Sequence, residues 1–336
     1  LSWTLMADFT IVGGGLAGCN LAIALHKRGK DVKVVDRGDS VTSTKVAAGI
    51  VNPITGPYLT KEPRFNEFWS HALKFYRTFE GLVGGNLFRE MSIVRLLDSE
   101  QQVSKWQSRL KSPSYQECLT DDPFHIGDEF HSEFGGFTIE CAGHLLTADF
   151  IDATKRLMGD QWQVGEILEP EPEGMTIFCE GVNGLHNPLF DWVHFRPAKG
   201  EILTVRINDL KEDRIVNRGR VWLLPIGDGV FRAGATYDWD SNDCNVTAEG
   251  REFIESRLKG LIKVPYEVLD QRAAVRPVIG TRKILIGIHP GHDRVGFFNG
   301  LGSKGVLLAP FFADNFAAHL CGEAEIDEGA DLRGNL

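Results

Sequence analysis

The sequence predicts a mixed α/β fold that contains one parallel sheet and one antiparallel sheet. Three observations lead to this prediction. A short apolar strand over 9–12 runs into the glycine-rich turn GGGLAG at 13–18 and then into a helix. Apolar and β-branched runs alternate with turn signals over 196–234, which is typical of an antiparallel sheet. A second glycine-rich turn at 300–305 precedes an apolar helix over 306–320.

The first element is a strand–turn–helix–strand unit over 8–36. Gly13 allows the tight turn out of the strand, Gly15 leaves room for a pyrophosphate, and Gly18 lets the helix pack on the sheet. The helix N-terminus offers N–H groups and a positive dipole end to phosphates. Asp36 ends the second strand, where its carboxylate can accept hydrogen bonds from a ribose diol. The unit therefore predicts a Rossmann-like site for an adenine dinucleotide.

The residue after that acid bears on which dinucleotide is bound. Arg37 would suit a 2′-phosphate, but the neighbouring Asp36 carboxylate would repel it, so a free 2′-hydroxyl fits better. The small, apolar segment Ala47-Ala48-Gly49-Ile50-Val51-Asn52-Pro53 can lie flat against a large planar ring. The turn at 300–305 is a second helix start, at which N–H groups can point at an electron-rich ligand edge. These two segments favour a flavin over a nicotinamide.

Periodicity and turn signals predict the remaining elements. We expect helices over 65–79, 149–158 and 247–261, short strands with polar turns over 81–144, and strands over 276–288.

Composition limits the function classes. The chain has 336 residues, enough for two subdomains, and no run approaches the roughly 18 apolar residues of a membrane span. Its net charge is −10 and its basic residues are scattered, which disfavours nucleic-acid binding. The six cysteines form no CxxC or paired pattern and the ten histidines no metal-ligand spacing, so we expect no metal site or disulfide framework. Such cysteines fit a reducing, cytoplasmic location, and we expect no secretory signal.

The motifs, taken in order, have a specific resemblance. GGGLAG, AAGIVNP, RPAKGEIL, LLPIGDGVFRAGATYD, VRPVIG and GLGSKGVLLAP follow one another from Asp8 to about Leu320. This order resembles the D-amino-acid oxidase superfamily of FAD-dependent oxidoreductases, to which glycine oxidase, sarcosine oxidase and the FAD domain of the tRNA wobble-uridine modification enzyme belong. The resemblance implies an α/β (α+β) fold with a discontinuous FAD-binding domain over 6–79, 141–195 and 276–322. It also implies an antiparallel-sheet substrate domain over 80–140 and 196–275 that covers the flavin face.

The resemblance also implies which residues contact FAD. The ADP half would contact Gly13, Gly15, Leu16, Ala17, Gly18, Asp36 and Arg37, and the isoalloxazine ring would lie beside Ala47, Ala48 and Gly49. The pyrimidine edge would be capped by Gly300, Leu301, Gly302, Ser303, Lys304 and Gly305, with Lys304 or the helix dipole stabilising negative charge there. Gly181 closes the segment IFCEG, which would return to the cofactor, although Cys179 and Glu180 replace the family's usual small residues.

The implied reaction is oxidation of the C–N bond of a small amino acid or secondary amine by hydride transfer from Cα–H to flavin. Oxygen or another acceptor would then reoxidise the flavin. The site needs a cation to fix the substrate carboxylate and a dry pocket, but no side-chain base. The sarcosine oxidase branch attaches FAD through a cysteine after the RP motif, and 281–284 has none, so we expect non-covalent FAD.

Four side chains are candidates for the chemistry. Arg276, in the VRP motif, would grip a carboxylate with two parallel hydrogen bonds, or alternatively be a structural arginine bonded to backbone carbonyls. Trp222 stands where related enzymes often have a tyrosine, and would wall the pocket, donate one bond or simply pack. Tyr237 is a further substrate-binding candidate. Lys45 would promote the oxygen reaction by its charge, or lie exposed at the surface.

Two other functions remain open on the sequence alone. One is an NADPH-dependent flavin monooxygenase or reductase of related fold. That group usually has a glycine–aspartate motif near the C-terminal FAD loop, and 297–300 lacks it. The second GxGxxG pattern, GLGSKG at 300–305, is the turn expected at the flavin edge, which leaves none for NADPH. The other is a flavin-binding protein without enzymatic activity.

Overall fold

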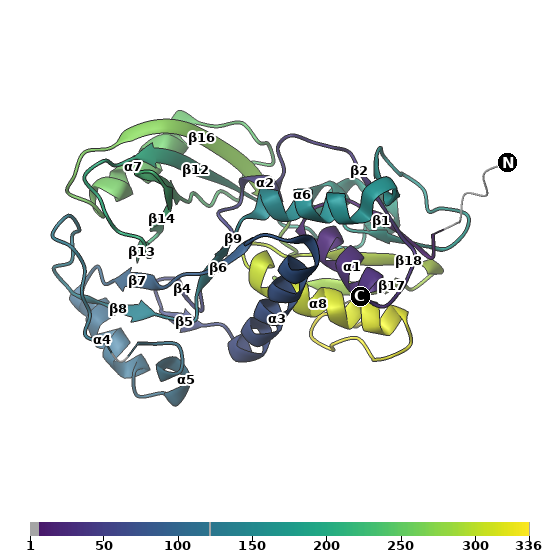
Figure 1. The fold of residues 1–336 in the computed structure, drawn as a ribbon, viewed down its shortest axis with the longest axis horizontal. Coiled ribbons are helices and arrows are strands. Elements are labelled where there is room, and N and C mark those ends of the chain that lie inside the picture. Colours follow the sequence, from purple (N-terminus) through teal and green to yellow (C-terminus); the bar gives the residue numbers. More distant parts are fainter. Residues whose placement is uncertain (1–6, 121, 336) are drawn as a thin grey trace.

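The computed structural model describes residues 7–120 and 122–335, and its two large sheets lie in two lobes along the long axis (Figure 1). The first sheet has six strands in the order β10-β2-β1-β11-β18-β17. All neighbours are parallel except the antiparallel pair β17–β18. Its strands are β1 (Phe9–Val12), β2 (Val32–Asp36), β10 (Trp162–Val164), β11 (Met175–Phe178), β17 (Leu285–His289) and β18 (His292–Asn299).

Helices cover one face of this sheet. The alternation of strand side chains sends Ile11 and Val34 into a cluster that they share with the helices. Val12 instead joins Phe190 and Phe297 in a second cluster on the opposite face. Because both faces are covered, the central strands are apolar on both sides. The helices are α1 (Leu16–Lys27), α3 (Phe65–Val83), α6 (Thr147–Met158) and α8 (Gly305–Leu320), and the second cluster includes the 3-10 turn η3 (Pro188–Phe190) after η2 (Gly181–His186).

The second sheet has seven strands in the order β16-β12-β15-β14-β13-β7-β8. Its neighbours are antiparallel, as the alternating sequence predicts, except that β13 pairs in parallel with β7. One face packs on helix α7 (Ala248–Lys259), and the other faces the first lobe. The strands are β7 (Ile93–Leu96), β8 (Gly136–Ile139), β12 (Ala198–Arg206), β13 (Ile215–Arg218), β14 (Val221–Gly227), β15 (Val230–Gly234) and β16 (Glu267–Arg276).

Short elements join the two lobes. They are α2 (Ser43–Val46), β3 (Ile50–Val51), β4 (Ile54–Thr55), β5 (Thr60–Lys61), β6 (Phe88–Glu90) and β9 (Gly143–Leu145). Figure 1 shows β6 and β9 between the lobes, with α3 beneath them. Over the described residues, no helix is both long enough and apolar enough to cross a membrane.

Two sequence-based expectations for secondary structure were wrong. The region 81–144 contains two helices, α4 (Glu100–Arg109) and α5 (Pro113–Gln116), besides its strands. Ser99 caps α4 by accepting from the Gln102 N–H, a capping signal that the sequence analysis did not use. The region 276–288 is not continuous strand, because β16 ends at Arg276 and β17 begins only at Leu285. Pro277 has no N–H for a further ladder bond.

Candidate functional site

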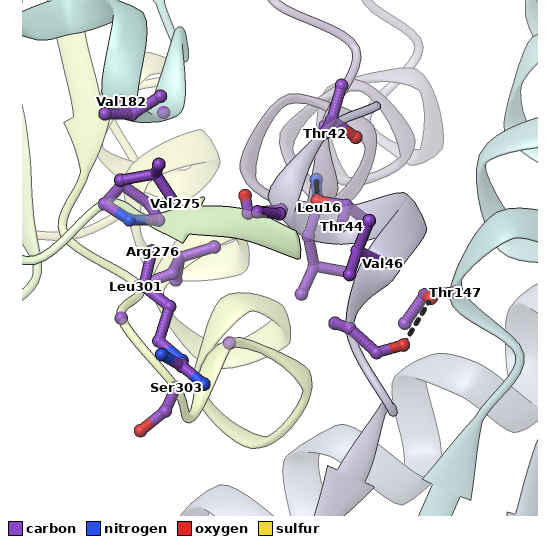
Figure 2. A pocket seen from close by; sticks show the side chains of 18 of the residues that line it. Leu16, Thr42, Thr44, Val46, Thr147, Val182, Val275, Arg276, Leu301 and Ser303 are labelled. Atoms are coloured by element: carbon purple, nitrogen blue, oxygen red, sulfur yellow. Dashed lines mark hydrogen bonds between the residues drawn. The ribbon is translucent and has the colours of Figure 1, made fainter. Parts of the chain in front are cut away.

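A cavity of about 640 Å³ lies between the two sheets. On one side, which we call the loop side, it is lined by the loops that follow β1, β2, β10 and β11. On the other, the sheet side, it is lined by the face of the seven-stranded sheet turned away from α7. Figure 2 shows Leu16, Thr44 and Val46 across the cavity from Arg276 and Ser303. The volume lies in the range of small-molecule and cofactor sites.

The glycine turn at 13–18 has the close approaches that the sequence predicts. Gly13 has φ +104°, and a Cβ there would lie 2.5 Å from the Cys179 carbonyl oxygen. A Cβ at Gly18 would lie 1.9 Å from the Gly13 carbonyl oxygen, so the helix could not pack as it does. A Cβ at Gly15 would meet only Thr44 Oγ1, at 3.4 Å, since Gly15 faces the cavity. Gly18 is a packing residue and does not line the cavity, whereas Gly13 and Gly15 do.

The start of α1 offers donors to this side of the cavity. The first helical hydrogen bond runs from the Cys19 N–H to the Gly15 carbonyl, so the preceding N–H groups have no helical acceptor. Leu16 N–H donates to Thr44 Oγ1 at 3.0 Å, a contact from a part of the chain that the sequence analysis did not single out. Gly15 and Ala17 also line the cavity. Their N–H groups and the dipole of α1 suit an anionic ligand.

Three acids and an arginine lie at or just after the ends of strands of the six-stranded sheet. The Asp36 carboxylate accepts hydrogen bonds from Gly14 N–H (2.7 Å) and Gly38 N–H (2.9 Å), and each oxygen keeps a lone pair for a ligand. Arg37 pairs with Glu166 at 2.9 Å. Because that carboxylate partly neutralises Arg37, the pair suits a hydroxyl better than a 2′-phosphate. Burial raises the pKa of Glu180, which also lines the cavity.

The segment 47–49 is held in place by the sheet side. Arg232 on β15 donates to the Val46 carbonyl (2.7 Å) and the Ala47 carbonyl (2.9 Å). Burial, together with nearby Arg272, lowers the pKa of Arg232 to about 10. Gly49 has φ +73°, and a Cβ there would lie 2.1 Å from the Leu145 carbonyl oxygen. Sequence reasoning missed Arg232, because nothing local to it indicates carbonyls that lie 185 and 186 positions away.

The second glycine-rich turn meets the cavity only in part. Four residues just before and at the start of α8 line the cavity: Leu301, Gly302, Ser303 and Gly305. The cavity is also lined by the other residues expected near the ring, Ala47, Ala48, Gly49 and Gly181. Gly300 does not, because it packs against the Lys283 carbonyl and Ile279. Lys304 does not either, since its ammonium pairs with Glu62. If positive potential acts on a ligand here, it comes from the dipole of α8 and its free N–H groups.

Arg276 lies at the end of β16 and lines the cavity. Its guanidinium donates to the Lys199 carbonyl and the Thr236 carbonyl, both at 3.2 Å, and lies 4.5 Å from the centre of the Tyr237 ring. Burial lowers the pKa of Arg276, and the Tyr237 phenol partly offsets this. A guanidinium has five N–H donors, so three remain for a ligand. Arg276 therefore bonds backbone carbonyls, as a structural arginine would, and still lines the cavity, where it could bind a carboxylate.

The other three candidate side chains lie in different surroundings. Trp222 lines the cavity, and its ring packs over Gly234. A Cβ added at Gly234 would lie 2.7 Å from the Trp222 ring. Tyr237 lines the cavity beneath Arg276 and is 45% exposed. Lys45 does not line the cavity, because its ammonium donates to the Asp39 carbonyl. The structure therefore brings Trp222 and Tyr237 to the cavity and leaves Lys45 outside.

Residues outside the cavity include a thiol pair that the cysteine spacing did not indicate. Cys118 and Cys141 lie in side-chain contact near Lys61. The contact with Cys141 and the charge of Lys61 lower the pKa of Cys118 to about 7. Neither cysteine lines the cavity. Within the described ranges, no group of three or more His, Cys, Asp or Glu residues is placed to hold a metal ion.

The cavity fits an adenine–flavin dinucleotide. Its loop side has backbone donors at the start of α1 for a pyrophosphate and the Asp36 carboxylate for a ribose. Next to these lie the small residues Ala47, Ala48 and Gly49, which leave space for a planar ring. The start of α8 then offers N–H groups to an electron-rich ring edge.

Comparisons with known proteins agree with this fit. A family model described as FAD dependent oxidoreductase (DAO) matches residues 8–319. A glycine oxidase of Bacillus subtilis strain 168 is 24% identical over 340 residues, which cover 90% of this chain and 90% of that protein. The tRNA 5-methylaminomethyl-2-thiouridine biosynthesis bifunctional protein of Marinobacter nauticus is 22% identical over 353 residues. The match covers 93% of this chain and 55% of that protein, so the chain spans about half of its length.

Solved structures share the fold. The iminodiacetate oxidase of Chelativorans sp. BNC1 has a TM-score of 0.83 at 18% identity, over 96% of this chain and 99% of that one. The glycine oxidase of Geobacillus kaustophilus has a TM-score of 0.81 at 17% identity, over 96% of each chain. At these identities the likeness shows the fold alone.

Proposed function

The chain belongs to the DAO family of FAD-dependent oxidoreductases, and from that premise we propose that it oxidises the C–N bond of a small amino acid or secondary amine. The single observation that supports this most is Arg276, a partly buried cation that lines the cavity and uses two of its five N–H donors on backbone carbonyls. The similar proteins are named for glycine and iminodiacetate, and both compounds pair an amine with a carboxylate.

We propose that FAD binds mainly to the loop side of the cavity and that the substrate binds to the sheet side. Gly13, Gly15, Leu16, Ala17, Asp36 and Arg37 would contact the ADP half of a non-covalent FAD, with Gly18 supporting the turn. Ala47, Ala48, Gly49, Gly181, Leu301, Gly302, Ser303 and Gly305 would surround the ring. The corresponding domains would be 6–79, 141–195 and 276–322 for the cofactor, and 80–140 and 196–275 for the substrate.

The bound flavin would supply the redox chemistry by accepting a hydride from the substrate Cα. Arg276 would hold the substrate carboxylate by two parallel hydrogen bonds and so fix the Cα–H direction. Tyr237 would support the guanidinium from below by a cation–π contact. Trp222, with Ile202 and Ala274, would exclude water from this part of the cavity.

The test is a titration of the FAD-loaded protein with a carboxylate such as benzoate or 2-furoate, followed by the flavin spectrum. Arg276→Ala should lose about 2–5 kcal/mol of carboxylate binding, because a charge-assisted pair is removed. That corresponds to about 30-fold to several-thousand-fold in affinity. Arg276→Lys should also be clearly impaired, since it keeps the charge but loses the fork.

The matched control is Arg272→Ala. Arg272 lies on the same strand, is exposed and pairs with Asp270 away from the cavity, so its loss should leave the titration unchanged. Acid should release intact FAD from every variant in equal amounts. If Arg276→Ala keeps its FAD and binds carboxylates as tightly as the wild type, Arg276 is only structural and the proposal loses its main support.

A further inference from the structure

A second arginine on the sheet side of the cavity has no role in the site described so far. Arg220 occupies the two-residue turn between β13 and β14, and its side chain lines the cavity. Among the described residues it has no hydrogen bond and no ion pair, whereas the other two lining arginines have partners: Arg37 pairs with Glu166, and Arg276 bonds two carbonyls. The neighbouring charge on Arg257 repels it.

The charges that line the cavity are unevenly distributed. Its acidic residues follow strands of the six-stranded sheet, on the loop side: Asp36, Asp39, Glu166 and Glu180. The described lining of the sheet side has two arginines, Arg220 and Arg276, and no carboxylate. A ligand on the sheet side therefore meets two positive charges that no lining acid neutralises.

The two arginines lie on different strands of the sheet side. The sheet order places β12 and β15 between β16, which ends at Arg276, and β14, which begins after Arg220. Three strand spacings of about 4.8 Å separate the two backbones by about 14 Å. Both residues line the same cavity, so a ligand held by Arg276 at one end could present its other end to Arg220.

We propose that the substrate is a dicarboxylic amine, an amino acid whose second carboxylate is bound by Arg220. This inference rests on the proposed function, in which Arg276 binds the first carboxylate. Arg220 would select for a substrate with a second acid, and a substrate with a neutral tail would leave that cation in water.

The test compares diacids with monoacids of equal length: succinate with butanoate, glutarate with pentanoate, and adipate with hexanoate. Each is titrated into the FAD-loaded protein while the flavin spectrum is followed. In the wild type, at least one diacid should bind on the order of tenfold more tightly than its monoacid, as one added charge-assisted bond allows. Arg220→Gln should remove that preference and leave monoacid affinity unchanged, and Arg220→Lys should keep part of it.

The matched control is Arg218→Gln in the same hairpin. Arg218 pairs with Glu133 and does not line the cavity, so this variant should keep the diacid preference. Equal affinity for diacids and monoacids in the wild type, or a preference that survives Arg220→Gln, would overturn the inference while monoacids still depend on Arg276. If no carboxylate perturbs the flavin in the FAD-loaded wild type, the proposed function itself is wrong, and the inference fails with it.

Discussion

The two sides of the cavity are built in different ways. The loop side consists largely of backbone groups from short segments, and the glycines of 13–18 shape it by leaving side chains out. The sheet side consists of side chains on separate strands, with Arg276 and Trp222 more than fifty residues apart. We therefore expect substitutions on the loop side to affect folding and cofactor binding, and substitutions on the sheet side to affect the ligand that binds beside the cofactor.

The largest loss of stability and of FAD binding is expected from a side chain added at Gly18, where the glycine turn has no space for one. Gly18→Val should cost about 3 kcal/mol or more of folding stability and abolish FAD binding, because even its Cβ would lie 1.9 Å from the Gly13 carbonyl oxygen. Gly81→Ala is the control, because Gly81 lies in helix α3 and a Cβ added there would have no neighbouring atom within 4 Å. It should be neutral or gain about 0.5–1 kcal/mol. Urea unfolding measures the stability of the two variants, and the bound FAD content measures their cofactor binding. A normal FAD content in Gly18→Val would contradict the close contact between Gly18 and the Gly13 carbonyl.

The next variant tests whether the sheet side supports the loop side. Arg232→Gln should cost about 1–3 kcal/mol of stability, because it weakens the bonds that hold the Val46 and Ala47 carbonyls. FAD affinity should fall as well, measured by equilibrium dialysis. Arg206→Gln in the same sheet removes an exposed arginine that pairs with Glu267, and should change neither quantity. Unchanged FAD affinity in Arg232→Gln would mean that the segment 47–49 holds its shape without the sheet.

A pH effect should arise beside that segment, at His144. Burial, with Arg232 and Arg89 nearby, lowers the pKa of His144 to about 4. Between pH 6.5 and pH 4, His144 is protonated in the unfolded chain but stays neutral in the folded protein. The free energy of unfolding therefore falls as the pH drops from 6.5 toward 4. The loss between pH 7 and pH 5 should be about 2 kcal/mol. His144→Gln should lose less stability over this interval in urea unfolding; an equal loss would show that His144 is protonated while folded.

The smallest effect tests the sheet side alone. A Cβ at Gly200 would lie 2.2 Å from Arg276 Nη2, so Gly200→Ala should push the guanidinium aside without unfolding the strand. Carboxylate affinity should then fall on the order of tenfold, about 1.4 kcal/mol, while FAD content stays normal. The measurement is the same carboxylate titration. Unchanged affinity would mean that the ligand does not contact Arg276.

The same contrast explains what the sequence could predict. The unit over 8–36 was predicted almost to the residue, because its glycines and its terminal acid act on chain neighbours. The mixed fold, the DAO family and the FAD cofactor were confirmed. The helices at 100–116, the contact of Arg232 with Ala47 and the position of Arg220 at the cavity were missed. The last two depend on pairing between distant strands, which local pattern does not encode.

The central claim is that the cavity holds FAD on one side and a carboxylate-bearing amine on the other. The most direct measurement is anaerobic mixing of the FAD-loaded protein with glycine, sarcosine, proline-like amines, D-amino acids and dicarboxylic amino acids, following flavin absorbance. We expect bleaching by at least one amino acid, and much slower bleaching in Arg276→Ala at equal FAD content. Bleaching by NADPH and by none of the amino acids would contradict it.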